Sequence, residues 1–248
     1  QLEDKLARLT LLNSEIKGLT LASTHNLQEP MRKVQTIIDR IQHMGGLEDK
    51  GLSEDMTRIR QIYARQQATN NTIIDYYHIL SRPLNLGRVD LTEVIATVSR
   101  QKPFAEGLHV VAASLRLVIA DPQQMQWLFT HIFANSLRFR HPERRPQVVV
   151  EPLAPPLDEL PAALQNAEYY CVSVSDNGIG IENGYKEKIF RLFQKIDEVP
   201  DTTGQNGMGL SFCRRIMLNH GGWISARKNQ QEGTTILLFF PFSTTLGK

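Results

Sequence analysis

Two short glycine-containing segments have residue types and a spacing suited to holding a nucleotide. The first, Asp176-Asn177-Gly178-Ile179-Gly180, follows an apolar run at 170–175 that predicts a buried strand. The second, Gly207-Met208-Gly209-Leu210, opens an apolar helical run. Glycines after an acidic strand end leave room for a flat ring to reach the backbone, and N–H groups at a glycine-rich helix start can hold phosphate oxygens. Together they predict a base pocket and a phosphate pocket, whereas either alone could equally be a turn.

Further motifs extend this pair into an ordered series. Asn135 lies in an apolar helical stretch before both segments, Ile189-Phe190-x-x-Phe193 lies between them, and Gly233-Thr234-Thr235 follows them. This succession resembles the N, G1, F, G2 and G3 boxes of the sensor histidine kinase catalytic domain, whose ATPase superfamily includes gyrase and the heat-shock chaperones. Upstream, His25-Asn26-Leu27-Gln28-Glu29-Pro30 resembles the phospho-acceptor H box in its "HDLQEP" form. The resemblance covers about residues 15–242.

The resemblance implies ATP and Mg²⁺ as cofactors. Asp176 would accept a hydrogen bond from the adenine exocyclic amine. It would discriminate against guanine at that edge, because an ionised carboxylate accepts hydrogen bonds and cannot donate one. Asn135 would coordinate Mg²⁺, for which one amide oxygen suffices because Mg²⁺ also takes phosphate oxygens and water. Arg138 would contact phosphate, and Thr235 would lie near the aspartate. The implied nucleotide-binding residues are thus Asn135, Arg138, Asp176, Gly178, Gly180, Gly207, Gly209 and Thr235.

Ordinary structural roles remain open for several of these residues. Asp176 could cap a helix or turn, Arg138 could belong to a solvated helix face, and Thr235 could be an ordinary strand residue. His131 stands where the family usually has Asn, and it could touch phosphate, ligate metal or only pack.

The stretch 181–206 is expected to form the ATP lid. Ile189, Phe190, Leu192 and Phe193 would dock it through apolar contacts, while its remainder is polar. Gln205 stands where the family often has glycine, which would reshape the phosphate pocket.

His25 and Glu29 are the predicted catalytic residues. A neutral imidazole nitrogen is a good nucleophile at physiological pH. The family usually places Asp or Glu directly after this histidine to orient and deprotonate the ring, but this sequence has Asn26. Glu29 shares a helix face with His25 and is the candidate replacement. Because loss of a general base typically costs about 10²–10⁴-fold in rate, slow or absent autophosphorylation is one expectation.

Two function classes follow. The first is a two-component sensor histidine kinase core, which uses ATP to phosphorylate His25 and passes the phosphoryl group to an aspartate of a response regulator. The alternative is a catalytically impaired, ATP-binding dimeric signalling scaffold, suggested by Asn26, His131 and Gln205 at motif positions. A chaperone- or gyrase-like ATPase ranks last, because it would not account for the H box.

Composition places the chain among ordinary globular proteins. It has 248 residues, 41% apolar and 22% charged, with a formal net charge of +2 that gives no reason to invoke nucleic acid or a membrane surface. Cys171 and Cys213 lie in apolar runs and predict buried free thiols in a reducing compartment. No apolar stretch approaches the roughly 20 residues that span a bilayer. The start at Gln1, inside a helical pattern, predicts a cytoplasmic fragment whose upstream sensor is missing, and leaves a membrane anchor in that missing part open.

The N-terminal third has the periodicity of two long helices. Leucines from Leu2 to Leu19 recur at helical spacing, the pattern continues beyond the H box, and Gly45-Gly46 ends it. Pro30 should bend this first helix. A second helix is predicted from an N-cap at Ser53, after a loop closed by Gly51, to just before Pro83. Because one hairpin has too little core to stand alone, residues 1–81 are expected to dimerise as a four-helix bundle.

The rest of the chain predicts an α/β sandwich, which makes the whole an α+β protein. After a linker at 82–90, the catalytic ATP-binding domain would span 91–248. Helices are predicted at 91–98, 122–139 and 210–219, and strands at 110–112, 116–119, 148–151, 169–174, 223–227 and 235–241. This order favours helices on one face of a mixed sheet. The proline-rich stretch 152–167 is interpreted as a surface loop or short helix inserted in a hairpin.

Overall fold

A computed structural model describes residues 32–39, 41, 49–165, 167–192, 207–230 and 232–242. The chain divides into two compact units, one of residues 1–78 and 195–208 and the other of residues 79–194 and 209–248. The predicted first helix, with its leucines, Pro30 and the Gly45-Gly46 pair, lies largely outside the described residues, although 32–39 are helical.

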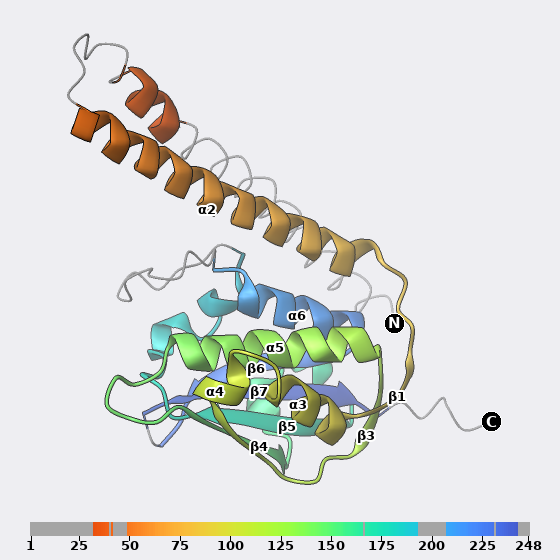
Figure 1. The fold of residues 1–248 in the computed structure, drawn as a ribbon. Coiled ribbons are helices and arrows are strands. Elements are labelled where there is room, and N and C mark those ends of the chain that lie inside the picture. The colour runs from red at the N-terminus through yellow and green to blue at the C-terminus, as the bar shows by residue number, and fades with distance from the viewer. Residues whose placement is uncertain are drawn as a thin grey trace. The chain divides into compact units, whose positions relative to one another are not determined.

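The second predicted helix is confirmed as α2, Asp49–Ser81 (Figure 1). It starts four residues before the predicted cap, so Gly51 and Ser53 lie within the helix and those two predictions are wrong. Asp49 is itself a short acidic residue of the kind favoured at helix starts, which explains why the helix begins one turn earlier. The end at Ser81 agrees with the steric restriction that Pro83 places on Arg82.

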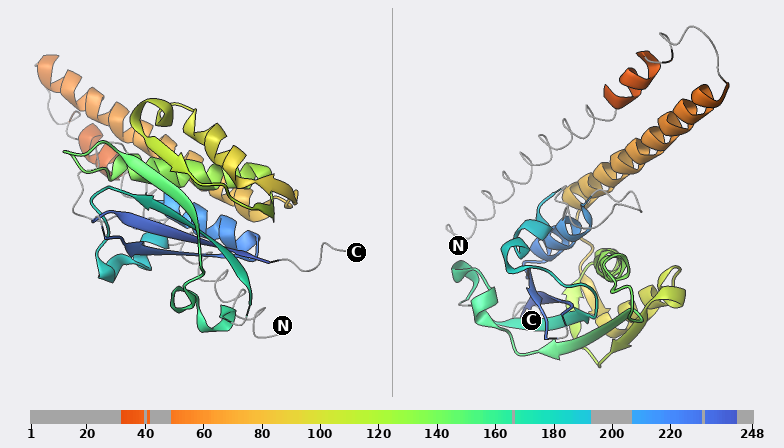
Figure 2. Two further views of the ribbon diagram at one scale, coloured as in Figure 1. Left: turned by 90° about the horizontal axis from the view of Figure 1, so that it is seen from below. Right: turned by 90° about the vertical axis from the view of Figure 1, so that its left-hand side faces the viewer.

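The second unit is an α/β sandwich. Its central sheet has the order β2-β4-β5-β7-β6, in which β2 and β4 are parallel and the other pairs antiparallel. A separate two-stranded sheet pairs β1 with β3. Helices α3, α5 and α6 cover one face of the central sheet (Figures 1 and 2). The bounds are β1 Gly87–Asp90, α3 Leu91–Ser99, α4 Phe104–Gly107, β2 His109–Ala112, β3 Leu117–Ala120, α5 Pro122–Arg138, β4 Gln147–Leu153, β5 Tyr169–Asp176, α6 Gly209–Asn219, β6 Trp223–Lys228 and β7 Thr234–Pro241.

N-cap residues and the spacing of apolar residues explain why helices α3 and α5 form. Asp90 and Asp121 each stand before a helix, and the side chain of each accepts hydrogen bonds from two backbone N–H groups of the first turn. Pro122 adds a fixed φ at the first position of α5, where no N–H is needed. Five apolar residues of α5 recur at helical spacing and are buried: Met125, Leu128, Phe129, Ile132 and Phe133.

Part of the predicted linker is structured. Residues 87–90 form β1, which pairs with β3 in the register Gly87 opposite Ala120. Val89 is buried in this pair. The sequence did not predict this strand, because a segment of four residues with a single apolar side chain shows no alternation of apolar and polar residues.

The proline-rich insertion covers the second face of the sheet. It forms two short 3₁₀ helices, Leu157–Glu159 and Ala162–Leu164, between β4 and β5. Leu160 is only 4% exposed and packs with a cluster that also contains Tyr169, Cys171, Trp223, Leu237 and Phe239. The interpretation as a surface loop is therefore incomplete, because this loop also buries an apolar sheet face that no helix covers.

Both cysteines are free and buried, as predicted. Burial raises the pKa of the Cys171 thiol to about 12, and it raises the pKa of Cys213 as well. Both thiols therefore stay protonated and unreactive at neutral pH.

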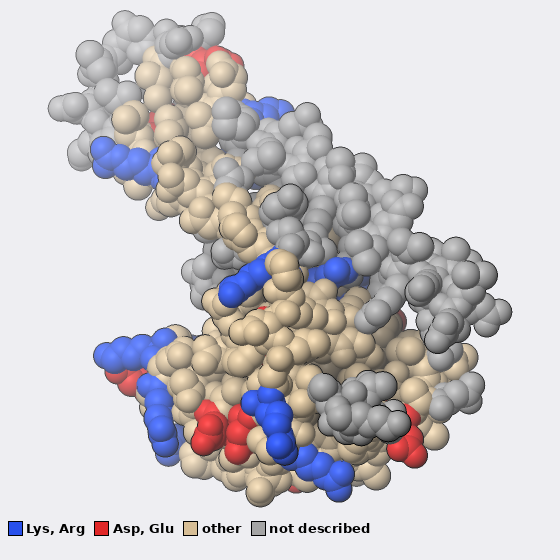
Figure 3. Space-filling view, turned by 90° about the vertical axis from the view of Figure 1, so that its right-hand side faces the viewer, with Lys and Arg blue, Asp and Glu red and all other residues tan. Residues whose placement is uncertain are grey.

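The described surface shows neither a membrane span nor a single-sign charge field. No helix among the described residues has the length and hydropathy to cross a membrane. In Figure 3, basic and acidic side chains are interspersed on the described part of the surface in view.

Two leucine truncations test the position of the core. Leu128 is fully buried on α5, whereas Leu117 on β3 is 52% exposed. We expect Leu128→Ala to lower the free energy of unfolding by about 2–5 kcal/mol through lost burial and a cavity, and Leu117→Ala by less than about 1 kcal/mol. Urea denaturation of both variants measures this difference. Equal losses would contradict the assignment of this helix face to the core.

Candidate nucleotide site

Asp176 is the last residue of β5, and its carboxylate is already part of a hydrogen-bond frame. The Oδ1 atom accepts bonds of 3.0 Å from the backbone N–H groups of Gly178 and Thr234. Burial raises the pKa of this carboxyl group, and the bonds from Thr234, Gly178 and the Ser136 side chain oppose that shift. An ionised carboxylate has about four acceptor positions, so the fixed group keeps capacity for one more donor.

The three glycines around Asp176 allow three backbone segments to meet. A Cβ atom on Gly178 would lie 2.3 Å from the carbonyl oxygen of Phe139, and one on Gly233 would lie 2.0 Å from that of Asp176. Gly180 has φ of 77°, and a Cβ there would lie 2.0 Å from the carbonyl oxygen of Glu232. The sequence suggested that Gly178 and Gly180 leave room for a base. In this structure their lack of a side chain leaves room for neighbouring backbone.

Thr235 does not take the position expected for it. It pairs with Ser175 across β5 and β7, and the two hydroxyl oxygens are 2.8 Å apart. Because side chains alternate along a strand, Thr235 faces the opposite side of the sheet from Asp176. The neighbouring Thr234 supplies the bond to Asp176 instead.

Sequence reasoning missed three residues of this frame: Ser136, Thr234 and Asn229. The Asn229 side chain donates a bond of 2.7 Å to the backbone carbonyl of Asp176. Thr234 could have been predicted, because the residue that lies opposite Asp176 on the neighbouring strand shares its face of the sheet. Nothing in the local sequence pointed to Asn229.

A second group of residues converges on the start of α6. His131 and Asn135 lie one turn apart on α5, and both face Gly209. A Cβ on Gly209 would be 3.7 Å from Asn135 Nδ2 and 3.8 Å from His131 Nδ1. Asn135 Nδ2 is buried and has no hydrogen-bond partner in the described part of the chain. A buried amide without a partner is costly, and this favours a ligand at this position.

His131 packs against α6 and is neutral. Its ring centroid lies 4.7 Å from that of Phe212. Burial lowers the pKa of His131 to about 4, so the imidazole carries no charge at physiological pH. Packing, one of the three roles left open by the sequence, therefore does occur.

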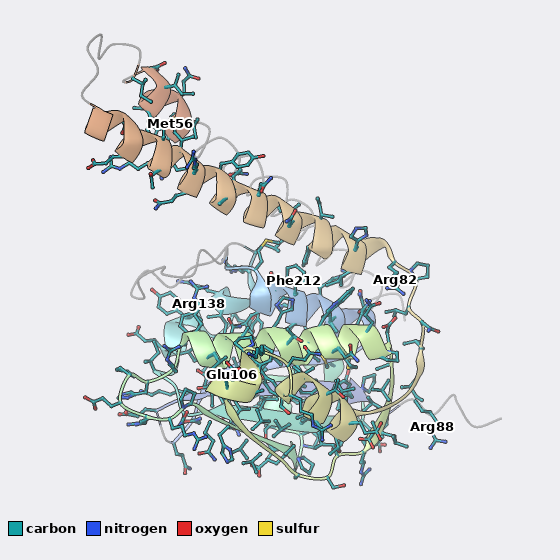
Figure 4. All side chains as sticks on the ribbon, in the orientation of Figure 1. Met56, Arg82, Arg88, Glu106, Arg138 and Phe212 are labelled. Atoms are coloured by element: carbon teal, nitrogen blue, oxygen red, sulfur yellow. The ribbon has the colours of Figure 1, made fainter. Side chains whose placement is uncertain are left out.

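Arg138 lies at the same end of the helix pair. It is the last residue of α5, and its guanidinium carbon lies 5.3 Å from the ring centroid of Phe139. Figure 4 shows Arg138 at the end of α5 beside the start of α6, where Gly209 also lies. Gly207 has φ of 67°, a left-handed conformation that favours glycine.

Arg214 of α6 holds the described part of the predicted lid, residues 181–192. Its guanidinium donates a 3.1 Å bond to Glu187 and lies 4.7 Å above the ring centroid of Trp223. Ile189 and Phe190 are buried, which agrees with their predicted docking role. Phe193 and Gln205 lie outside the described residues, as do His25, Asn26 and Glu29 of the H box.

Comparison with known proteins identifies the family. Residues 120–244 match the family described as "Histidine kinase-, DNA gyrase B-, and HSP90-like ATPase". The chain belongs to this ATPase family. The matched region contains Asn135, Asp176 and Gly209. We call the α/β sandwich from β1 to β7, residues 87–192 and 209–241, the ATPase domain from here on.

The curated relatives are sensor kinases and phytochromes. The phytochrome-like protein Cph1 of Synechocystis sp. is 25% identical over 245 residues, covering 96% of this chain and 31% of that protein. The sensor protein kinase WalK of Staphylococcus epidermidis is 22% identical over 241 residues, covering 88% of this chain and 35% of that protein. The chain thus spans about a third of the length of such relatives. The resemblance to sensor histidine kinases drawn from the motifs is confirmed.

Two solved structures share the fold. Histidine kinase ThkA, in complex with response regulator protein TrrA, aligns with a TM-score of 0.60 at 19% identity, over 96% of this chain and 64% of that chain. Acinetobacter baumannii histidine kinase AdeS aligns with a TM-score of 0.53 at 14% identity, over 88% of this chain and 98% of that chain. At these identities the likeness supports the fold alone.

A pair of glycine substitutions tests the close backbone approach at Asp176. We expect Gly180→Ala to lower the free energy of unfolding by at least about 1–3 kcal/mol, because it combines a left-handed φ with overlap against Glu232. The matched control is Gly184→Ala, where a Cβ meets no atom within 4 Å. We expect that control to change stability by less than about 0.5 kcal/mol. Thermal or urea denaturation measures both, and an unaffected Gly180→Ala would contradict this account of the loop.

Proposed function

We propose that this chain is the core of a two-component sensor histidine kinase. It binds ATP, phosphorylates itself on His25 and passes the phosphoryl group to an aspartate of a response regulator. The observation that carries the proposal is the pairing of two polar centres in one ATPase domain. One is the fixed carboxylate of Asp176, and the other is the amide of Asn135, which faces Gly209 and whose Nδ2 has no partner in the described part of the chain.

The frame around Asp176 supports adenine recognition. The two backbone N–H groups on Oδ1 fix the plane of the carboxylate, so the remaining acceptor positions point in set directions. A carboxylate fixed in this way accepts from the exocyclic amine of adenine and has no donor to offer the guanine carbonyl. Preorganisation of this kind reduces the entropy lost on binding.

The residues at the start of α6 fit a magnesium–triphosphate group. The Asn135 amide offers an oxygen to Mg²⁺, and its buried Nδ2 has no hydrogen-bond partner among the described residues and can donate to a phosphate oxygen. Backbone N–H groups at the start of a helix such as α6 favour phosphate oxygens, as does the positive end of the helix dipole. Bound Mg²⁺ would neutralise charge on the phosphates. Arg138 is the proposed basic contact, and the nucleotide-binding set also includes Gly178, Gly180 and Gly207.

The chemistry assigned to His25 is an in-line phosphoryl transfer. Its imidazole nitrogen forms a bond to the γ-phosphorus, the bond to the β–γ bridging oxygen breaks, and ADP leaves with that electron pair. The ring proton passes to a base, for which Glu29 is the proposed acceptor because Asn26 cannot take a proton. The alternative function, favoured by Asn26, His131 and Gln205 at motif positions, is a catalytically impaired, ATP-binding dimeric signalling scaffold.

The apolar surface of α2 supports a homodimer of the predicted 1–81 hairpin. Met56, Tyr63 and Ile74 are 44%, 62% and 53% exposed. Their separations of seven and eleven residues are close to two and three helical turns, so they share one face. Buried residues such as Asp55 and Tyr76 lie on a different face, so the exposed stripe is the surface of α2 that is still uncovered. A second hairpin packed against this stripe would complete a four-helix bundle.

The partners and location follow from the same proposal. The ThkA structure contains the response regulator TrrA, and by analogy we propose a receiver domain as the phosphoryl acceptor here. The relatives are about three times longer than this chain, which supports an upstream sensor region. We propose that the kinase core acts in the cytoplasm.

Autophosphorylation is the decisive test of the function. With γ-labelled ATP and Mg²⁺, we expect acid-labile label on the wild-type chain and none on His25→Ala, because the variant lacks the attacking nitrogen. Asn26→Asp should speed labelling by up to about 10²-fold if the missing acidic residue limits the rate. Nucleotide binding without any label would favour the scaffold, and equal labelling of His25→Ala would exclude His25 as the acceptor.

Calorimetry tests the two halves of the nucleotide site separately. We expect Asp176→Asn to weaken ATP binding about tenfold or more, because it opposes two donors at a cost of roughly 1–3 kcal/mol. The Asn oxygen can still accept from Gly178 and Thr234, so the domain should remain folded. Asn135→Ala should weaken Mg²⁺-dependent ATP binding more than adenosine binding. Unchanged ATP affinity in Asp176→Asn would mean that the base lies elsewhere.

Multi-angle light scattering tests the assembly. We expect a dimer mass at micromolar concentration, because the exposed stripe on α2 needs a partner. Met56→Glu together with Ile74→Glu should shift the chain toward monomer by burying like charges. A monomer mass for the wild-type chain would refute the bundle.

A further inference from the structure

Polar side chains, of which Asp121 is buried and Asn219 and His220 are partly buried, form a second cluster at the opposite end of the α5–α6 pair. The nucleotide candidates lie where α5 ends and α6 begins. At the other end, the backbone N–H of Asp121, just before α5, donates a 2.9 Å bond to Nε2 of His220, just after α6. The two helices are therefore antiparallel and are tied together at both ends. None of the motifs used above accounts for His220 or Asn219.

Asp121 is shared between α5 and the segment that enters the ATPase domain. Its Oδ1 accepts from the N–H groups of Gln123 and Gln124 at 3.0 and 3.1 Å, and its Oδ2 accepts from Asn85 N–H at 3.0 Å. Burial would raise the pKa of Asp121, but these three N–H groups and the charge of Arg82 lower it below its ordinary value. The group is therefore an anion that holds residue 85 and caps α5 at once.

His220 is held in one tautomer by its neighbours. Its Nε2 meets the Asp121 N–H, which can only donate, and its Nδ1 lies 2.7 Å from the Ile216 carbonyl oxygen, which can only accept. The proton must therefore be on Nδ1, and the ring is neutral. Burial lowers the pKa of His220, although the Ile216 carbonyl and the Asp121 charge oppose that shift.

Two further side chains bind the same entering segment. Both amide hydrogens of Asn219 are used, one on the Ile79 carbonyl oxygen at 3.1 Å and one on Gln124 Oε1 at 3.2 Å. The guanidinium of Arg82 donates to Gln123 Oε1. Figure 4 shows Arg82 where the chain leaves α2. The stretch 79–85 is thus fastened at residues 79, 82 and 85.

The fastening between α2 and β1 is polar. Ile79, at the end of α2, is 2% exposed and Leu84 is partly buried, whereas the side chains of Arg82, Pro83, Asn85 and Leu86 are exposed. Residues 82–86 are therefore held mainly by polar contacts. Hydrogen bonds of this kind contribute about 0.5–1.5 kcal/mol each and exchange readily with water. Segments held in this way open locally at a small fraction of the global unfolding free energy.

We propose that Asp121, Asn219, His220 and the Arg82–Gln123 pair form a linker latch, which fastens residues 79–85 to the ATPase domain and opens while that domain stays folded. The closed latch holds residues 79–85 against the ATPase domain. The open latch leaves α2 and the ATPase domain joined by a short free stretch. Under the proposed function, opening gives the ATPase domain the freedom to reach the phospho-acceptor helix. The latch itself does not depend on that function.

Hydrogen exchange on the whole chain without nucleotide tests the latch. The Asn85 amide should exchange faster in Arg82→Ala by about two- to tenfold, and in Asn219→Ala by about tenfold, because these variants remove one and two bonds. The matched control is Arg88→Ala, an exposed arginine of β1 six residues further on, which should exchange at the wild-type rate. Amides of β5 and β7 should keep their wild-type protection in all three variants.

Three results would overturn the proposal. They are unchanged exchange at Asn85 in Asn219→Ala, an equal effect of Arg88→Ala and Arg82→Ala, and equal acceleration in the core strands, which would mean global unfolding. ATP affinity, measured on the same variants, should stay within about twofold of wild type because the latch is remote from Asp176 and Asn135. A chain that fails to bind ATP would refute the proposed function and leave the exchange result as an independent test.

Discussion

The packing of α5 against α6 is the interaction on which the other features depend. The buried apolar face of α5, with Phe129 and Phe133 fully enclosed, fixes its rotation on the sheet. Cys213 of α6 lies close enough to α5 for its thiol to meet the Leu128 carbonyl at 3.7 Å. Because a close-packed core permits few alternative arrangements, both ends of the pair are fixed together. One end gathers Asn135, His131 and Gly209, and the other gathers Asp121 and His220.

The second constraint is backbone crowding beside Asp176. The end of β5, the turn before β7 and the residue after α5 approach so closely that only glycine fits at 178, 180 and 233. The carboxylate then becomes the acceptor for N–H groups from two of these segments. A group that could have been a passive cap is thereby held rigid, and rigidity is what a recognition group requires.

Polar and apolar attachments have different consequences in this chain. The ATPase domain is held by buried side chains on both faces of its sheet, including Leu160 from the proline-rich insertion. The chain entering the domain is held at residues 82 and 85 by hydrogen bonds with little apolar burial. Apolar burial makes a unit that opens only as a whole, whereas a few polar bonds make one that opens locally. The two kinds of attachment lie within a few residues of each other.

The sequence by itself determined the regular elements and the family. Helical and strand periods are local properties, so α3, α5, α6 and the strands of the central sheet lie within one residue of their predicted bounds, apart from β4 and β5, which end two residues later. Caps such as Asp121 and breakers such as Pro83 act on neighbouring backbone and are equally visible. The motif series resembling sensor histidine kinases was also visible, because it rests on residue types and order alone.

Tertiary structure decided which side chains meet. Only the pairing of β5 with β7 places Thr234, and not Thr235, beside Asp176, because a shift of one residue moves a side chain to the other face. Only the approach of separate segments explains the glycines, the burial of Leu160 and the bonds from Asn219 and His220 to positions far earlier in the chain. Local period carries no information about such contacts, since they join residues up to 140 positions apart.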